Sequence, residues 1–341
     1  MFHLDPLGAF AEAGRSPGPI EAHLIAGANA GARLSAPYPK ASLFLASGRV
    51  VHEAGGAAAD ELGFMAASAL AYAKALVRAG LSLDEAFARI TLGLSADAQY
   101  FRTIAKLRAA RIVWGRITEA CGVEVPARIE ARSSRRMLAA QDVWTNMLRL
   151  TIAGFGAATG GADAVVLGCF TDPLGLPTEF ARRQSRNAQL VLMEEAHVGA
   201  VANPGRGAWF IESLTDQIAR GGWAAFQAIE AAGGAARALE AGCVATERAA
   251  EPPVVGVTVF ANANDTPPKV ETVAASASAF RCVGFGRAAL GVRVGTDEAR
   301  GATEQCLMDD HVQDFIDILD TPMALNATLD HESRGRAKRC S

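Results

Sequence analysis

The sequence predicts an α/β protein in which helices wrap a parallel sheet. Short apolar segments of strand length alternate along the chain with longer amphipathic segments, as in repeated strand–helix units. The apolar segments are hydrophobic on both faces, as buried parallel strands are. No glycine-rich phosphate-binding motif is found, so a (β/α)8 barrel of TIM type is favoured over nucleotide-binding folds. Because only about five strands are predicted, we expect an incomplete barrel.

The individual elements follow from periodicity and from the residues that end each segment. Strands are predicted at 42–47, 89–94, 127–131, 163–170 and 254–260. Helices are predicted at 19–34, 57–78, 82–87, 98–121, 142–159, 177–195 and 210–232. Ser82 is expected to cap the helix that follows it, and Gly80 and Gly122 to end the helices before them. Residues 1–18 and 48–56 are expected to be loops, the first with one helical turn.

The composition bounds the class of protein. Of the 341 residues, 50% are hydrophobic and 20% are charged, which is enough to bury a sizeable core. The net charge of −3 gives no indication of a nucleic-acid partner. The six cysteines are scattered without a CxxC pair, so neither a zinc site nor a disulfide framework is expected. Without a secretion signal or a stretch long enough to span a membrane, the chain is expected to be cytoplasmic and to have no membrane partner.

The loop after the third predicted strand is the first candidate for a functional site. The stretch 131–161 reads as a strand end, a polar turn and a helix closed by two glycines, which is the length of one strand–helix unit. Barrels place their chemistry in the loops at the carboxyl ends of strands. Arg132 and Ser134 lie at such an end, and Gln141 and Asn146 follow in the turn and helix, so these four are candidate substrate-binding residues.

Four sequence blocks, in order along residues 5–264, carry a family resemblance. They are TIAKLRAAR at 103–111, QDVWTN at 141–146, LGLPTEFARRQSRNAQ at 174–189 and ANPGRGAWFIESLT at 202–215. These blocks resemble the cobalamin-dependent acyl-CoA mutases, and most closely the small-subunit type of the methylmalonyl-CoA mutase family. The resemblance implies a TIM barrel that encloses an acyl-CoA, followed by a domain that binds cobalamin.

The same resemblance marks where this chain differs from active family members. Active members carry SGYHxQEAGA after one strand, and residues 47–56 here read SGRVVHEAGG. Arg49 and Val50 therefore replace a Tyr–His pair that contacts the thioester, and an aliphatic side chain cannot stabilise a developing oxyanion. Arg135 stands where the family has glycine, so the mouth of the barrel is expected to be filled or charged.

The resemblance also bears on the cofactor and on domain organisation. The family's lower cobalt ligand lies in a DxHxxG motif, whose nearest match here places Asp314 at the glycine position after His311. This chain alone is therefore expected to bind no cofactor, with adenosylcobalamin belonging to the family complex. Residues 1–264 are expected to form the partial barrel, and 265–341 a divergent, partly disordered segment without a recognisable cobalamin domain. The first strands of the family's barrel are expected to be missing.

Two pairs of residues are open to alternative interpretations. His52 and Glu53 could form an acid–base pair, or Glu53 could cap the next helix. Glu194 and His197 have the spacing of a carboxylate–histidine metal motif, but no second motif accompanies them, so a metal site is not expected.

Further polar residues lie within the blocks that match the family. The basic residues are Arg182, Arg183 and Arg186. They could reach CoA phosphates, although surface salt bridges with Glu179 and Glu194 are favoured. The residues with amide side chains are Asn146, Asn187 and Gln189. They could contact substrate, although a role in hydrogen bonds that hold loops in place is favoured.

Three hypotheses for function follow. The favoured one is a non-catalytic chain of the small-subunit type, which forms a heterodimer with a large catalytic subunit that isomerises methylmalonyl-CoA and succinyl-CoA. The second is an active acyl-CoA isomerase component that works with a separate cobalamin-binding chain. The third is a truncated relic without function. An incomplete barrel leaves two strand edges open, so the isolated chain is expected to associate.

Overall fold

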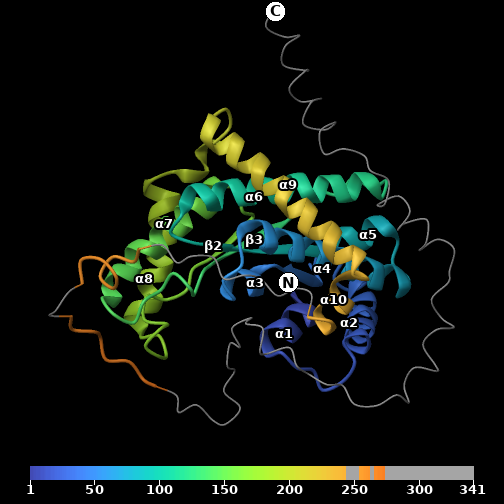
Figure 1. Cartoon of the computed structure of the whole chain (residues 1–341), viewed down its shortest axis with the longest axis horizontal. Coiled ribbons are helices and arrows are strands. Elements are labelled where there is room, and N and C mark those ends of the chain that lie inside the picture. Colours follow the sequence, from blue (N-terminus) through green and yellow to red (C-terminus); the bar gives the residue numbers. More distant parts are fainter. Residues whose placement is uncertain (243–252, 262–264, 273–341) are drawn as a thin grey trace, which may run out of the picture.

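The structure is a computed structural model that describes residues 1–242, 253–261 and 265–272. These residues form a parallel sheet with helices packed on it (Figure 1). His311 and Asp314 lie outside the described residues.

Four parallel strands form the sheet. They are β1 (Phe44–Ser47), β2 (Ile90–Ala96), β3 (Ile129–Ser133) and β4 (Ala164–Val166). They lie side by side in the order β1-β2-β3-β4. A doubly wound sheet reverses its strand order at a switch point, whereas a barrel keeps the chain order. The α/β class and the partial TIM-type barrel are therefore confirmed.

Three long helices connect the strands and cover one face of the sheet. They are α4 (Ala58–Arg78) after β1, α6 (Tyr100–Ala120) after β2 and α7 (Asn146–Thr159) after β3. Phe44, Leu92 and Ile129 are fully buried in the core that these helices share with the sheet. Because successive side chains of a strand point to opposite faces, their neighbours in sequence face away from the helices. Helices on one face only are what a barrel requires.

The remaining helices surround this unit. They are α1 (Pro6–Ala13), α2 (Ile20–Ser35), α3 (Arg49–Glu53), α5 (Leu83–Ala88), α8 (Glu179–Leu190), α9 (Trp209–Ala231) and α10 (Gly234–Glu240). Short 3-10 turns lie at Val143–Thr145 and Val198–Ala200, and a π-helical turn at Val191–Glu195 extends α8. As expected, Ser82 caps α5, because its Oγ accepts a hydrogen bond from the backbone N–H of Glu85 at 3.3 Å.

Helix α9 lies across α4 and α6 (Figure 1). Two glycines allow this close approach. A Cβ atom on Gly63 of α4 would lie 2.5 Å from the Cβ of Ala225, and one on Gly222 of α9 would lie 2.7 Å from Leu62. Only glycine therefore permits the observed packing at these two positions. Leu62 and Phe226 are buried in the resulting contact.

The fourth and fifth predicted strands differ from the structure. β4 has three residues instead of eight, because the N–H groups of Gly168 and Cys169 bond to side chains of Ser133 and Asp172 instead of a neighbouring strand. The predicted strand at 254–260 is wrong. Its backbone folds on itself at Gly256, which has a φ of 82°, and the N–H of Gly256 donates to the carbonyl of Val259.

Two expectations about the amino-terminal half also need correction. The predicted loop at 48–56 contains the short helix α3. The edge of β1 is not open, because residues 2–4 run beside it. Phe2 N–H donates to the Ser42 carbonyl and Leu4 N–H to the Leu43 carbonyl, both at 2.9 Å. Within the described part of the chain, β4 therefore has the sheet edge that no other strand covers.

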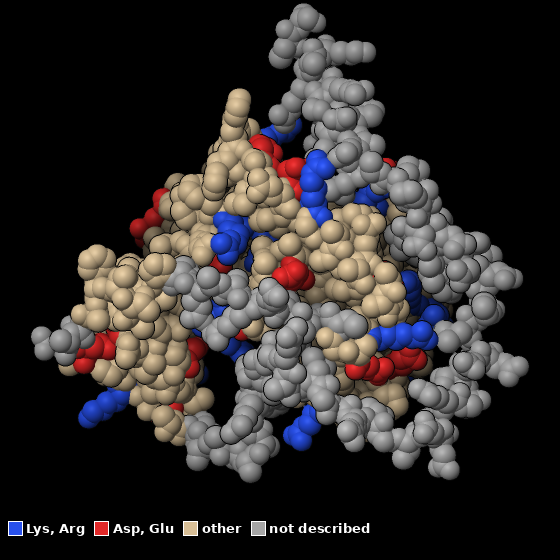
Figure 2. All heavy atoms as spheres, in the orientation of Figure 1, with Lys and Arg blue, Asp and Glu red and all other residues tan. Residues whose placement is uncertain are grey.

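The described surface has a mixed character. Acidic and basic side chains are interspersed on the face shown in Figure 2, between larger areas of other residues. No helix among the described residues has the length and apolar character needed to span a membrane.

Candidate functional site

Five buried polar side chains gather at the carboxyl ends of β1, β2 and β3. We refer to them as the polar cluster; they are His52, Glu61, Ser95, Lys106 and Ser134. Each is at most 5% exposed, and Glu61 and Ser95 are fully buried. The carboxyl ends of the strands are the functional face of a barrel, so this is the place to look for chemistry.

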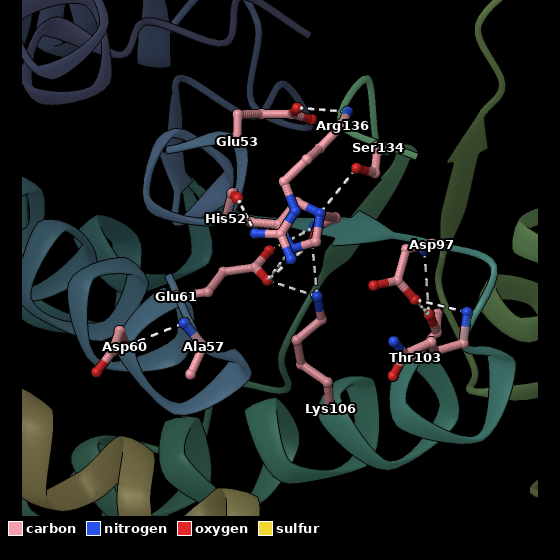
Figure 3. Close-up of polar contacts among 12 residues, drawn as sticks. His52, Glu53, Ala57, Asp60, Glu61, Asp97, Thr103, Lys106, Ser134 and Arg136 are labelled. Carbon is pink, nitrogen blue, oxygen red and sulfur yellow. Dashed lines mark hydrogen bonds and ion pairs between the residues drawn. The ribbon is translucent and has the colours of Figure 1, made fainter. Parts of the chain in front are cut away.

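Two strand ends and three helices bring the polar cluster together. Ser95 lies near the end of β2, and Ser134 directly follows β3. His52 comes from α3, which follows β1 after a single residue. Glu61, in the first turn of α4, and Lys106, in the second turn of α6, point toward each other (Figure 3). The cluster thus joins the three complete strand–helix units of the described sheet.

Glu61 is the centre of the polar cluster. Its Oε1 accepts a hydrogen bond from the Ser95 N–H at 2.6 Å, and its Oε2 accepts one from the Ser95 Oγ at 2.8 Å. Lys106 Nζ donates to Oε2 at 2.5 Å and to the Ser95 Oγ at 2.6 Å. A buried ion pair is tolerated when further hydrogen bonds satisfy both partners. Glu61 and Lys106 meet that condition within the fold.

His52 is a neutral, enclosed histidine. Its Nε2 lies 2.8 Å from the Ser134 Oγ, a hydrogen bond whose direction depends on the tautomer. Burial lowers the pKa of His52 to about 3, and the positive charge of Lys106 adds to this effect. The 3.7 Å approach of its Nδ1 to Glu61 is therefore not a salt bridge at neutral pH. A histidine in this state has no proton to give to a substrate as an acid.

A second set of contacts ties α3 to the loop after β3. Glu53 accepts hydrogen bonds from the N–H groups of Arg135 at 2.9 Å and Arg136 at 3.0 Å. Burial raises the pKa of Glu53, and these two bonds oppose the rise. Arg136 returns a hydrogen bond from Nη1 to the carbonyl of His52 at 2.9 Å. Glu53 and His52 thus turn to different partners, and both fasten the loop.

The alternative interpretation, in which Glu53 caps the next helix, is wrong. Asp60 takes that part, because its Oδ2 accepts a hydrogen bond from the Ala57 N–H at 3.1 Å (Figure 3). Glu53 lies before the turn that precedes α4, and its carboxylate already binds two backbone N–H groups of the neighbouring loop.

Arg49 and Val50 open α3, and Arg132 lies on β3. Val50 is half-buried and packs against the main core. Arg132 pairs with Glu130 at 3.2 Å. Burial lowers the pKa of Arg49, and the nearby positive charge of Arg132 lowers it further. Two arginines thus lie near each other where the family resemblance implies substrate contact.

Asn146 is fully buried and fastens the loop before α7. Its Oδ1 accepts a hydrogen bond from the Ala139 N–H at 3.1 Å, and its Nδ2 donates to the carbonyls of Ala139 at 2.8 Å and Phe170 at 3.0 Å. Arg149 Nη1 donates to the same Oδ1 at 2.7 Å. The interpretation of Asn146 as a residue that holds loops fits these contacts.

The other sequence-predicted residues are not part of the polar cluster. Gln141 is exposed in the loop before α7. Arg186 and Asn187 are exposed on α8, and Gln189 on the same helix is half-buried. Helix α8 packs on α7, which contacts β3 and β4, and so lies away from α3 along the sheet (Figure 1). The structure therefore brings together His52 and Ser134, but not these four residues.

The expected salt bridges on α8 are absent among the described residues. None of the ion pairs found there involves Arg182, Arg183 or Arg186. Arg183 instead lies over the ring of Phe180, 5.7 Å from its centroid. Arg183 is thus occupied by an aromatic contact, and Arg182 and Arg186 are exposed.

Sequence reasoning missed the buried partners of His52. Glu61 and Lys106 were not predicted, because charged residues on helices usually face solvent. A signal was available: Lys106 lies between Ala105 and Leu107, three residues after Thr103, and all of these are buried. A lysine inside the apolar stripe of a helix needs a buried counter-charge.

The described residues do not fit a metal or cobalt ligand at this site. Within residues 1–242, 253–261 and 265–272, no group of three or more His, Cys, Asp or Glu side chains is placed to hold a metal ion. A cobalt ligand needs an accessible imidazole nitrogen, whereas His52 is enclosed and bonded to Ser134. Glu194 and His197 lie in the turns after α8, far along the chain from this cluster.

A hollow of about 620 Å³ lies elsewhere, between the end of α6 and the start of β3. Its lining includes Thr118, Glu119 and Glu124. The hollow lies at the amino ends of the strands, where the residues of a barrel contribute to stability and not to catalysis. We therefore place the functional face at the polar cluster.

Comparison with known proteins gives consistent matches. The family model described as methylmalonyl-CoA mutase matches residues 2–275. A methylmalonyl-CoA mutase small subunit from Streptomyces virginiae is 43% identical over 215 residues, which covers 62% of this chain and 35% of the relative. A probable methylmalonyl-CoA mutase small subunit from Mycobacterium bovis is 45% identical over 194 residues, covering 55% of this chain and 32% of the relative.

A methylmalonyl-CoA mutase from Escherichia coli is 34% identical over 212 residues, covering 61% of this chain and 30% of the relative. The chain thus spans about a third of the length of these relatives.

Proposed function

The chain belongs to the methylmalonyl-CoA mutase family, and from this premise we propose that it is a non-catalytic chain of the small-subunit type. It pairs with a large catalytic subunit in a cytoplasmic heterodimer and supports the isomerisation of methylmalonyl-CoA and succinyl-CoA there. Adenosylcobalamin belongs to the complex and not to this chain alone. In this proposal residues 1–264 are the partial barrel domain, and 265–341 are a separate divergent segment.

The observation that carries the proposal is the closed state of the polar cluster. Glu61, Lys106 and Ser95 form hydrogen bonds with one another, and the neutral His52 forms a hydrogen bond with Ser134. A catalytic acid or base must reach the substrate within hydrogen-bond distance. Side chains that are at most 5% exposed and already paired serve the fold instead.

Two further observations support the non-catalytic assignment. Val50, at a position where the family resemblance implies a hydrogen-bonding histidine, packs against the core and offers no donor. Relatives that are 43–45% identical carry the name small subunit, which supports a large partner subunit for this chain.

Co-purification followed by a mutase assay tests the proposal. The full chain and a large mutase subunit are co-expressed, and the complex is assayed with adenosylcobalamin beside each chain alone. We expect a heterodimer and turnover only when the large subunit is present. His52→Gln is the informative variant: in a complex that still forms, turnover should stay within about twofold, whereas loss of a general acid or base costs about 10²–10⁴-fold.

Two results would overturn the proposal. The first is turnover by this chain with adenosylcobalamin and no large subunit. The second is a loss of about a hundredfold or more in the His52→Gln complex while size-exclusion chromatography shows the heterodimer intact. Either result would favour an active isomerase component instead. Absence of any complex with a large subunit would also contradict the small-subunit assignment.

A further inference from the structure

The outer side of α8 carries exposed side chains that no part of the polar cluster contacts. The helix continues through the π-helical turn, so its residues lie on one element from Glu179 to Glu195. Its inner side packs on α7, where a Cβ atom on Gly154 would lie 3.3 Å from Leu192. Its outer side lies at the edge of the described structure (Figure 1). We call this side the α8 face; its exposed residues are Arg182, Arg186, Leu190, Val191, Met193 and Glu194.

The centre of the α8 face is apolar. Leu190 is 44% exposed, Val191 45% and Met193 62%. Single exposed apolar residues are common on protein surfaces, whereas neighbouring ones that form a patch indicate contact with another molecule. Three such side chains lie here within four residues of one helix.

Charges of opposite sign flank this apolar centre. Arg182 and Arg186 precede it, and Glu194 follows it. Because Arg182, Arg186, Leu190 and Glu194 recur every four residues, about one helical turn, they lie in one row along the helix. Among the ion pairs and side-chain hydrogen bonds of the described residues, none involves these two arginines or Glu194. The charges of the α8 face are therefore available to a partner.

The order of these side chains makes the α8 face complementary to itself. Arg186 and Glu194 are each four residues from Leu190, which is about 6 Å to either side along the helix axis. If a second α8 lies antiparallel to the first with the two Leu190 side chains together, Arg186 of each copy lies opposite Glu194 of the other. Interfaces with two-fold symmetry use the same patch on both subunits in this way. The net charge of −3 gives little repulsion between two copies.

We propose that the α8 face binds the α8 face of a second copy of this chain, antiparallel and with two-fold symmetry. Leu190, Val191 and Met193 of both copies form the centre of the contact, and an Arg186–Glu194 pair closes each end. One pair of helices buries less surface than a standard interface, so we expect a reversible dimer with a dissociation constant in about the micromolar range. The contact goes beyond the proposed function, because it requires neither the large subunit nor the polar cluster.

Analytical ultracentrifugation of the full chain, without a large subunit and over a series of concentrations, tests the proposal. We expect a reversible equilibrium between monomer and dimer for the wild-type chain. Arg186→Glu should weaken the dimer by about tenfold or more, because it places like charges opposite each other at both ends. Leu190→Glu should weaken it as much, because it puts two carboxylates into the apolar centre. Arg33→Glu makes the same change of charge on exposed α2, away from α8 (Figure 1), and should alter the dimer by less than about twofold.

An exchange of charges is the decisive variant. Arg186→Glu combined with Glu194→Arg should restore most of the affinity that Arg186→Glu alone removes, because each copy again presents opposite charges to the other. Within one chain the two positions are eight residues apart, about 12 Å along the helix, so their side chains do not pair there. Restored association therefore reports a contact between copies. Far-ultraviolet circular dichroism of each variant checks that the fold is unchanged.

Four results would overturn the proposal. The wild-type chain could remain a monomer throughout the series, or the exchange of charges could fail to restore association. Association could also persist unchanged in Arg186→Glu and Leu190→Glu, which would indicate the open edge of β4 instead. Finally, Arg186→Glu could leave self-association intact and abolish co-purification with a large subunit, which would assign the α8 face to that subunit. The first three are measured without a large subunit, so they are separate from failure of the proposed function.

Discussion

Replacement of Lys106 by methionine should destabilise the fold strongly, while the same change combined with Glu61→Gln should not. Lys106 is 2% exposed and Glu61 is fully buried, so removal of the ammonium group leaves a carboxylate without its counter-charge inside the core. Such a loss costs about 3–5 kcal/mol. In the double variant no buried charge remains, and the amide introduced by Glu61→Gln would still bond to Ser95. We therefore expect the two changes together to cost at least about 2 kcal/mol less than their sum.

Urea unfolding followed by far-ultraviolet circular dichroism measures these differences in the full chain. The matched control is Lys74→Met. Lys74 pairs with Glu230 at 3.2 Å, but their side chains are 23% and 19% exposed, so water screens the charge that remains. We expect this control to cost less than about 1 kcal/mol.

The reasoning fails if Lys106→Met costs as little as Lys74→Met, because the carboxylate would then not be held in a closed site. It also fails if the costs of Lys106→Met and Glu61→Gln simply add. Additive costs would mean that the two groups act separately and that the polar cluster is not one unit.

Three further perturbations test other parts of the fold. Burial raises the pKa of the Asp5 carboxyl group from 3.8 to about 6. The folded state therefore binds the carboxyl proton more tightly than the unfolded state does. This stabilises the fold at low pH, and the stabilisation is lost as the pH rises through 6. Asp5→Asn cannot ionise, and its unfolding free energy relative to wild type should rise by up to about 3 kcal/mol between about pH 4 and pH 8; a flat difference in urea titrations would contradict the raised pKa. Gly63→Ala should cost about 1–3 kcal/mol by thermal unfolding, since its Cβ would overlap Ala225, and a neutral result would mean that α9 can shift. Asn146→Ala should cost about 3 kcal/mol and expose the Ala139 amide to hydrogen exchange, whereas continued protection of that amide would argue against the observed bond.

The sequence was sufficient to place those helices and strands whose formation depends on residues close together in the chain. The periodicity of α4 and α6, the Ser82 cap and the apolar run of β2 each depend on neighbouring residues, and each was placed within a few residues. The apolar runs around β4 and at 254–260 were less informative. Leu167 and Phe170 are buried, but they pack without pairing in the sheet. The apolar run around β4 therefore indicates that its residues are buried, and it does not indicate that all of them form a strand.

The candidate site was predictable only in part. His52 and Ser134 could be placed at strand ends from chain order alone, because parallel strands end at the same edge of the sheet. Their hydrogen bond, and the contact of His52 with Glu61, join residues that are distant in sequence and depend on how the helices rotate. The exposed positions of Arg186 and Asn187 likewise follow from the way α8 packs on α7, which no local pattern encodes.

The crossing of α9 over α4 and α6 has a consequence for how this chain is made. Strands that pair in chain order could each dock as soon as they leave the ribosome, since every partner has already been synthesised. Helix α9 begins only at Trp209 and packs back on a helix that ends at Arg78. Until that point α4 and α6 have an uncovered apolar surface, so we expect the nascent chain to depend on chaperones through most of its synthesis and to become a cooperative unit late.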